Sequence, residues 1–183
     1  MDRTLKSTIR SFALNLSFSA YHLLLGYLSK SWWLLTLGTY YLLLSAIRIF
    51  ALRWRGKSVA KIAGAMLLLL CIPLAGTVIL AAVKDRGQRL HEILMITVAL
   101  YAFTKITLAI LNLIKSRRDS SAKVVTLRII SLADAFVSIF ALQRSMIVSF
   151  GGLSAFEILL FNIITGSAVW VIILLLGIYL IKK

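Results

Sequence analysis

Cysteine, proline, histidine and acidic residues are all scarce in this chain of 183 residues, which has one Cys, one Pro, two His and six Asp or Glu. The single Cys71 cannot form an intrachain bridge, which excludes a disulfide-stabilised scaffold. One proline and ten glycines leave little room for irregular structure, so helix is the expected state. Two histidines without a carboxylate cluster give no basis for a metal site. We therefore expect neither a metal nor a cofactor.

Hydrophobic residues are abundant instead. They make up 61% of the chain, and the mean hydropathy is +0.96. An ordinary soluble domain has an apolar share nearer about half. Lys and Arg number 21 against six acidic residues, which gives a formal net charge of +15. In a soluble chain this excess would point to nucleic acid. Combined with long apolar runs it indicates a membrane protein, and we expect no nucleic-acid partner.

Six apolar stretches approach or exceed the length of about 20 residues that crosses a bilayer. The connections between them are short, so neighbours in sequence should be antiparallel neighbours in space. The predicted fold is all-α: a polytopic membrane protein forming one compact six-helix transmembrane domain over residues 1–183, with no soluble domain. The predicted spans are residues 7–28, 32–52, 60–83, 93–114, 124–150 and 153–181.

The basic residues near the span ends predict the orientation. The N-terminus, the second and fourth connections and the C-terminus carry thirteen of them, whereas the first and third connections carry four. Basic residues concentrate in cytoplasmic loops, so we expect a plasma-membrane protein with both termini in the cytoplasm. The thirteen basic residues at that end, the basic rim, should contact anionic lipid. Trp32, Trp33 and Trp54 are expected as interfacial anchors. Arg48 is expected to snorkel to the cytoplasmic interface.

Two charged residues are too deep to snorkel. Lys105 lies about 15 Å of helix from Lys115, and Asp134 about 16 Å from Lys123, at about 1.5 Å per residue. Both depths fall near the middle of a hydrocarbon core about 30 Å thick. Facing residues of an antiparallel hairpin have a constant sum of residue numbers, and Lys105 and Asp134 lie at matching depth. The sequence therefore predicts a buried ion pair between the fourth and fifth spans.

Further polar residues follow the same seam. Tyr101 and Ser138 have the same residue-number sum as the predicted pair, and Tyr101 and Asn112 share a helix face with Lys105. A charge in mid-membrane is costly, and such residues are functional candidates by default. We therefore expect a substrate or ion-coupling site at five positions: Tyr101, Lys105, Asn112, Asp134 and Ser138.

Four secondary candidates lie elsewhere. The hairpin arithmetic predicts that Arg144 and Glu157 face each other near the outer surface, where a partly solvated pair would act as a modest brace or as a gate. His22 and Asn15 are seven residues apart on nearly the same face of the first span. Both should point into the bundle, where a hydrogen-bonded histidine is commoner than a proton relay.

The sequence contains no nucleophile with its base, no phosphate-binding glycine loop and no catalytic carboxylate pair, so we do not expect an enzyme. We expect a small integral membrane transporter or a solute-binding permease subunit, acting as a homodimer or within a larger membrane complex. The alternative is a non-transporting sensor, assembly or regulatory subunit whose intramembrane ion pair is structural. Water access to Lys105 would favour transport, and a dry, closed pair would favour the alternative.

Overall fold

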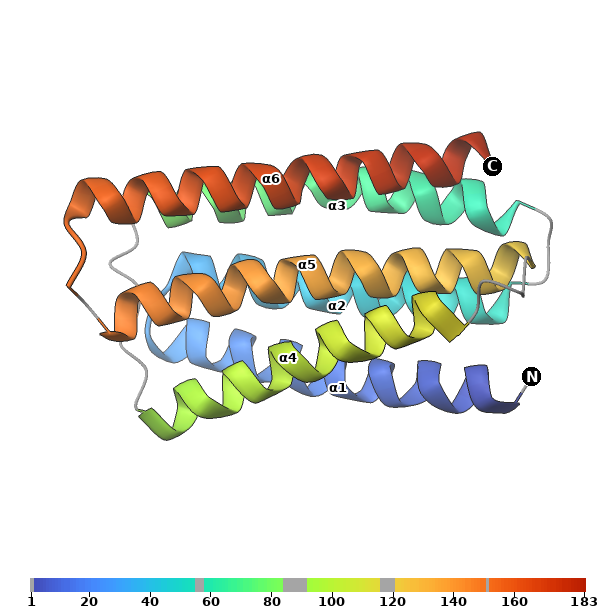
Figure 1. Cartoon of the computed structure of the whole chain (residues 1–183), viewed down its shortest axis with the longest axis horizontal. Helices are drawn as coiled ribbons and strands as arrows, with labels where there is room; N and C mark the ends of the chain where they lie inside the picture. The colour runs from blue at the N-terminus through green and yellow to red at the C-terminus, as the bar shows by residue number, and fades with distance from the viewer. Residues whose placement is uncertain (1, 55–57, 84–91, 116–120, 151) are drawn as a thin grey trace.

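The computed structural model describes residues 2–54, 58–83, 92–115, 121–150 and 152–183, and of residues 2–11, 83, 92–95, 97, 98, 112, 113, 115 and 150 it describes the backbone only. The described residues form six α-helices joined by short connections (Figure 1). The helices are α1 (Asp2–Leu28), α2 (Trp32–Arg53), α3 (Val59–Val83), α4 (Glu92–Lys115), α5 (Ala122–Phe150) and α6 (Ala155–Lys182).

The all-α prediction is confirmed, and most helix ends fall within two residues of the predicted spans. The main difference is α1, which begins five residues earlier because the helix continues past the apolar stretch into its basic start. Within the described residues, the helices long and apolar enough to cross a membrane are four, α2, α3, α5 and α6. The apolar stretches described in α1 and α4 are shorter, Phe12–Leu28 and Ala99–Leu111.

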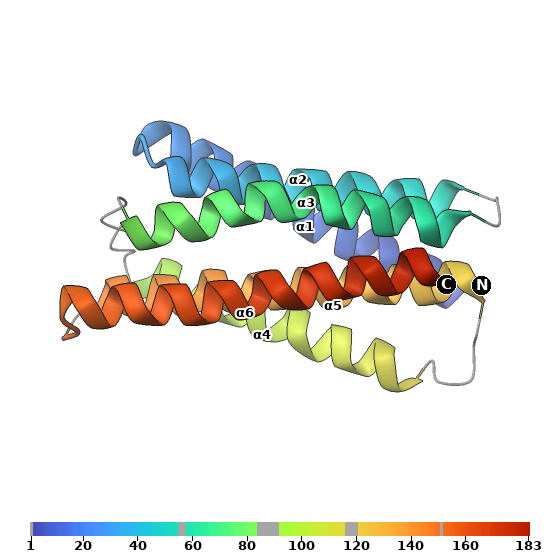
Figure 2. The same ribbon diagram turned by 90° about the horizontal axis from the view of Figure 1, so that it is seen from above.

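The helices form two layers of three. Figure 2 shows α2 and α3 on one side of the bundle and α4, α5 and α6 on the other, with α1 beside α2 at its C-terminal end and running obliquely toward the second layer at its N-terminal end. Across the interface α3 packs on α6 and α2 on α5, while α4 crosses α1 obliquely (Figure 1). Facing helices are antiparallel: Cys71 contacts Trp170 and Ala81 contacts Asn162, so residue numbers rise along α3 as they fall along α6. Each helix of the second layer therefore runs antiparallel to the helix that it faces in the first layer.

Glycines permit the closest helix contacts. A Cβ on Gly64 of α3 would lie 2.7 Å from the carbonyl oxygen of Gly177 on α6, a distance that real Cβ atoms do not tolerate. A Cβ on Gly38 of α2 would lie 2.8 Å from the side chain of Leu23 on α1. Small residues bring helix backbones together in this way in membranes, where the lipid is as apolar as the side chains. The pairs α1–α2 and α3–α6 are therefore held by close packing.

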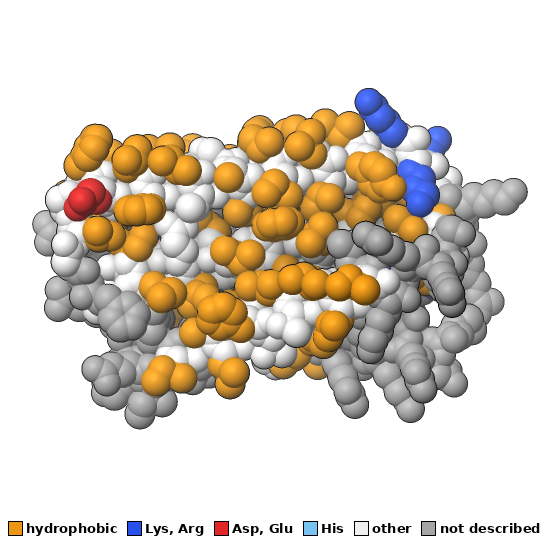
Figure 3. Space-filling view, in the orientation of Figure 1, with side chains coloured by type: hydrophobic (Ala, Val, Ile, Leu, Met, Phe, Trp, Pro, Cys, Tyr) orange, Lys and Arg blue, Asp and Glu red, His pale blue; other side chains and the backbone are white. Residues whose placement is uncertain are grey.

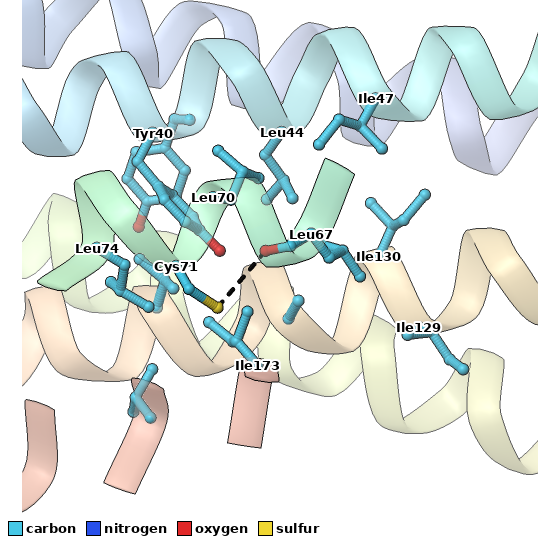
Figure 4. Close-up of a cluster of buried hydrophobic side chains, with 14 of the residues drawn as sticks. Tyr40, Leu44, Ile47, Leu67, Leu70, Cys71, Leu74, Ile129, Ile130 and Ile173 are labelled. Carbon is cyan, nitrogen blue, oxygen red and sulfur yellow. Dashed lines mark hydrogen bonds between the residues drawn. The ribbon is translucent and has the colours of Figure 1, made fainter. Parts of the chain in front are cut away.

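A buried apolar cluster fills the space between the layers on the side of α3 (Figure 4). Figure 4 shows Tyr40 and Leu44 of α2 beside Leu67 and Cys71 of α3, with Ile130 of α5 and Ile173 of α6 closing the cluster. Cys71 Sγ donates to the carbonyl oxygen of Leu67, 3.6 Å away in its own helix. The central part of this half of the interface is consequently apolar.

The outer surface is apolar along most of its length. In Figure 3 hydrophobic side chains are spread along the described part of the visible face, with lysine and arginine side chains at the end that holds the C-terminus and an acidic one at the opposite end. Trp32 is 69% exposed, as expected for an interfacial anchor, but Trp33 is only 6% exposed. The anchor prediction is therefore wrong for Trp33, which points into the bundle.

Candidate functional site

Asp134 is the centre of a buried polar cluster. Its Oδ1 accepts a hydrogen bond from Lys105 Nζ at 2.5 Å. Its Oδ2 accepts one from Asn15 Nδ2 at 2.8 Å and one from Arg48 Nη2 at 3.3 Å. We call these four residues the Asp134 cluster. One carboxylate thus receives a donor from each of α1, α2 and α4.

The Asp134 cluster is closed to the outside in this conformation. The side chains of Lys105 and Asp134 are 6% and 3% exposed, and that of Arg48 is 1% exposed. Asp134 lies about 18 Å of helix from the start of α5, at about 1.5 Å per residue. The cluster therefore lies near the middle of the helices and between the two layers, since α1 and α2 belong to one layer and α4 and α5 to the other.

Two tyrosine rings hold the Lys105 ammonium. Nζ lies 4.4 Å from the ring centroid of Tyr41 and 4.6 Å from that of Tyr101. Such cation–π contacts are worth about 0.5–1 kcal/mol when exposed and about 2 or more when desolvated. Tyr101 in turn stacks on Phe18 of α1 with centroids 3.6 Å apart. Lys105 therefore keeps its position through contacts that are independent of Asp134.

A second ring of hydrogen bonds supports the cluster. Tyr101 Oη donates to Asn15 Oδ1 at 3.1 Å, which orients the amide so that its nitrogen faces Asp134. The hydroxyls of Tyr41 and Ser138 lie 3.2 Å apart, and Ser138 Oγ donates to the backbone carbonyl of Asp134. Buried polar groups are costly unless they are paired in this way.

The structure brings together most of the predicted residues. Lys105 and Asp134 form the expected pair, with Tyr101 and Ser138 beside it. Asn112 falls on α4, but its side chain lies outside the described residues. Asn15, a secondary candidate expected to point inward, is a direct partner of Asp134.

Arg48 was missed by the sequence reasoning. The snorkelling prediction is wrong, because the guanidinium turns inward, contacts Asp134 and donates to Ser131 Oγ at 3.3 Å. Arg48 lies seven residues after Tyr41, so the two share a face of α2. The sequence alone places neither residue relative to Asp134, so it held no signal that could have put Arg48 beside the site.

His22 lies next to the cluster without bonding to it. It is 5% exposed, as the inward prediction required. Its Nδ1 lies 2.8 Å from the carbonyl oxygen of Phe18, one turn earlier in α1. The His22 ring is 5.8 Å from the ring of Tyr41, centroid to centroid. His22 is thus a neighbouring titratable group and not a direct partner of Asp134.

Arg144 and Glu157 do not form the predicted pair. Glu157 is exposed, and its carboxylate accepts from the backbone N–H and the hydroxyl of Ser154 as the capping box of α6. Arg144 is 2% exposed, and its Nη1 donates to the carbonyl oxygen of Ala81 at 2.6 Å. Its guanidinium also lies 4.7 Å from the ring centroid of Trp33. Arg144 therefore joins three helices inside the bundle and is not a surface brace.

Among the described residues no three His, Cys, Asp or Glu side chains lie together as a metal ion would require. No protein-family model matches the chain, and no curated protein or solved structure matches it. The class of protein is therefore assigned from fold and site alone. In the part of the chain that the structure describes, the all-helical fold, the four long apolar helices and the apolar surface indicate a helical membrane protein with a charged cluster in its interior.

Proposed function

We propose that the chain is a small integral membrane transporter or a solute-binding subunit of a permease, with all six helices crossing the plasma membrane. The Asp134 cluster is its substrate or ion-coupling site. Both termini lie in the cytoplasm, and the basic rim at that end contacts anionic lipid headgroups. The chain works as a homodimer or in a larger membrane complex.

The observation that carries the proposal is the place of the cluster in the two-layer fold. Asn15 and Arg48 come from one layer, and Lys105 and Asp134 come from the other. Many secondary transporters consist of two repeats of inverted topology, with the site at mid-membrane between them. Two antiparallel three-helix layers with charges shared across their interface support a site of this kind.

Helix α4 is the element best suited to move. Its main neighbour in the bundle is α5, and its outer face is apolar, with Leu100 and Phe103 more than 60% exposed. The Lys105–Asp134 ion pair and the Tyr101–Phe18 stack fix it to the rest of the site. If a substrate or ion replaced Asp134 as the partner of Lys105, α4 would be held less tightly and the interface between the two layers would open.

Thiol accessibility tests whether water reaches the cluster during function. Ser138→Cys places a thiol beside Asp134 and Tyr41, in a Cys71→Ser background whose hydroxyl can keep the bond to Leu67. A membrane-impermeant methanethiosulfonate should label it from at least one side of the membrane. The matched control is Ile139→Cys, one residue along on the outer face and 39% exposed, which should stay unlabelled because lipid suppresses thiolate formation.

The second candidate is a non-transporting membrane subunit whose cluster only fixes helix docking. The observation in its favour is the closure of the cluster, in which Asp134 accepts three hydrogen bonds from other helices. This candidate expects Ser138→Cys to remain unlabelled from both sides in a folded protein. That result would overturn the transport proposal.

A further inference from the structure

We propose that the Asp134 cluster binds a small monocarboxylate anion together with a proton. The proposal rests on the proposed function and assigns its substrate class. The proton goes to the Asp134 carboxylate, and the incoming carboxylate takes over the donors that Asp134 releases.

The first step is that the cluster is already a carboxylate-binding site. Its donors are divided between two oxygens, with Lys105 on Oδ1 and both Arg48 and Asn15 on Oδ2. Arginine and amide donors placed around a planar, two-oxygen acceptor suit a carboxylate better than a spherical halide. Asp134 is thus an internal occupant that a free carboxylate of the same geometry can replace.

The second step is the charge balance. Protonation of Asp134 removes one negative charge, and the bound anion restores it, so the cluster carries the same net charge before and after exchange. An anion entering without a proton would face the Asp134 carboxylate. Protonation without an anion would leave Lys105 and Arg48 without the negative charge they share. Because the donors bind one carboxylate at a time, and protonation is what frees them from Asp134, anion and proton should enter together and leave together.

The third step is that the donors stay in place when Asp134 is protonated and no longer accepts their hydrogen bonds. Lys105 Nζ remains between the rings of Tyr41 and Tyr101. Asn15 remains bonded to Tyr101, and Arg48 to Ser131. A preorganised donor set loses little entropy on binding. The exchange therefore needs no new donors.

Asp134 is the group whose protonation this exchange requires, so its polar and titratable surroundings matter. Asn15 and His22 lie on α1, Tyr40, Tyr41 and Arg48 on α2, Tyr101 and Lys105 on α4, and Ser131 and Ser138 on α5 itself. On the side of α3 and α6, Cys71 of α3 lies near Tyr40 in the buried apolar cluster. His22 is the group in this set whose side-chain type ordinarily titrates near neutral pH, so His22→Gln serves as the control for pH effects.

Formate is the probe, because it is small and ionised between pH 5.5 and 8. Its binding to the purified, full-length protein in detergent is measured by thermal stabilisation, with chloride at equal concentration as the control. If Asp134 must be protonated, the apparent Kd of the wild type should rise about tenfold per pH unit where Asp134 is mostly ionised, because the competent fraction falls in proportion. His22→Gln should keep this slope.

Asp134→Asn imitates the protonated carboxyl. It should bind formate with a Kd that does not change with pH, and at pH 8 it should bind at least about tenfold more tightly than the wild type. Adding Lys105→Met should abolish the binding. If Asp134→Asn does not fold, the wild-type pH series alone still decides the matter.

Equal stabilisation by formate and chloride, or an apparent Kd for wild type that is flat with pH, would overturn the carboxylate–proton proposal. Labelling of Ser138→Cys alongside either result would leave the transport function standing with another substrate. Formate binding with the expected slope but without labelling would overturn transport while retaining the carboxylate site.

Discussion

Neutralising Asp134 should destabilise the protein more than removing Lys105, although the two form one ion pair. After Lys105→Met, Asp134 still accepts from Arg48 and Asn15. After Asp134→Asn, Lys105 and Arg48 lose the negative charge that they share. An isolated pair would predict similar costs for the two substitutions, so their difference measures the role of Arg48.

The magnitudes follow from what each substitution leaves buried. Loss of one hydrogen bond to a charged group costs about 1.5–3 kcal/mol, which is the expectation for Lys105→Met. Leaving buried charge uncompensated costs about 3–5 kcal/mol, which is the expectation for Asp134→Asn. At about 2–4 °C per kcal/mol for a chain of this length, the Tm of Asp134→Asn should be roughly 3–8 °C below that of Lys105→Met.

Thermal unfolding of the purified variants in detergent measures whether Asp134→Asn has a lower Tm than Lys105→Met. The double variant Lys105→Met with Asp134→Asn should recover only part of the stability, because the Arg48 charge remains buried. Adding Arg48→Met should recover more, since that triple variant carries none of the three charges. A Tm for Asp134→Asn at or above that of Lys105→Met would refute the shared-carboxylate account. Full recovery in the double variant would refute the part assigned to Arg48.

Three further outcomes are expected. Arg144→Ala should cost about 2–4 kcal/mol in unfolding free energy, because it removes a buried guanidinium from the Ala81 carbonyl, whereas Glu157→Ala should cost less because it removes only an exposed capping interaction; equal costs would contradict this. Gly64→Ala should lower the Tm because its Cβ would meet a carbonyl of α6, whereas Gly76→Ala, with nothing within 4 Å, should leave it unchanged or raise it. A C-terminal tag should react with a membrane-impermeant label only after cells are opened. Labelling of the tag on intact cells would contradict the cytoplasmic position of the C-terminus.

Much of the helical layout could be predicted because it depends on local pattern. Apolar stretches long enough to span a bilayer, separated by short polar connections, give six helices with ends close to those observed. The Lys105–Asp134 pair could also be predicted, because adjacent antiparallel helices have a fixed register. Both residues lie on one hairpin, α4–α5, and the constant-sum rule applies there.

The partners from α1 and α2 could not be placed by that rule. Asn15 and Arg48 are 119 and 86 residues from Asp134 in sequence, and no short turn fixes their register to α5. Their position depends on how one three-helix layer faces the other. The wrong pairing of Arg144 with Glu157 has a local cause, since α6 begins at Ala155 with Ser154 as its N-cap and Glu157 completes the capping box. The Glu157 carboxylate therefore bonds to Ser154 in the capping box and not to Arg144, the partner that the residue-number rule predicts.

The two halves of the layer interface differ in a way that bears on function. On the side of α3 and α6, Gly64 and Gly177 bring the backbones into contact, and the cluster around Leu67 and Ile173 fills the space with apolar side chains. Helices α4 and α5 contain no glycine, and α4 meets α1 through side chains. Buried ion pairs can often be replaced by apolar residues at no loss of stability or with a gain of about 1–4 kcal/mol. Docking alone therefore gives little reason for two cations and a carboxylate between α1, α2, α4 and α5. We expect the glycine-packed half to act as the hinge, and the half that contains the Asp134 cluster to open.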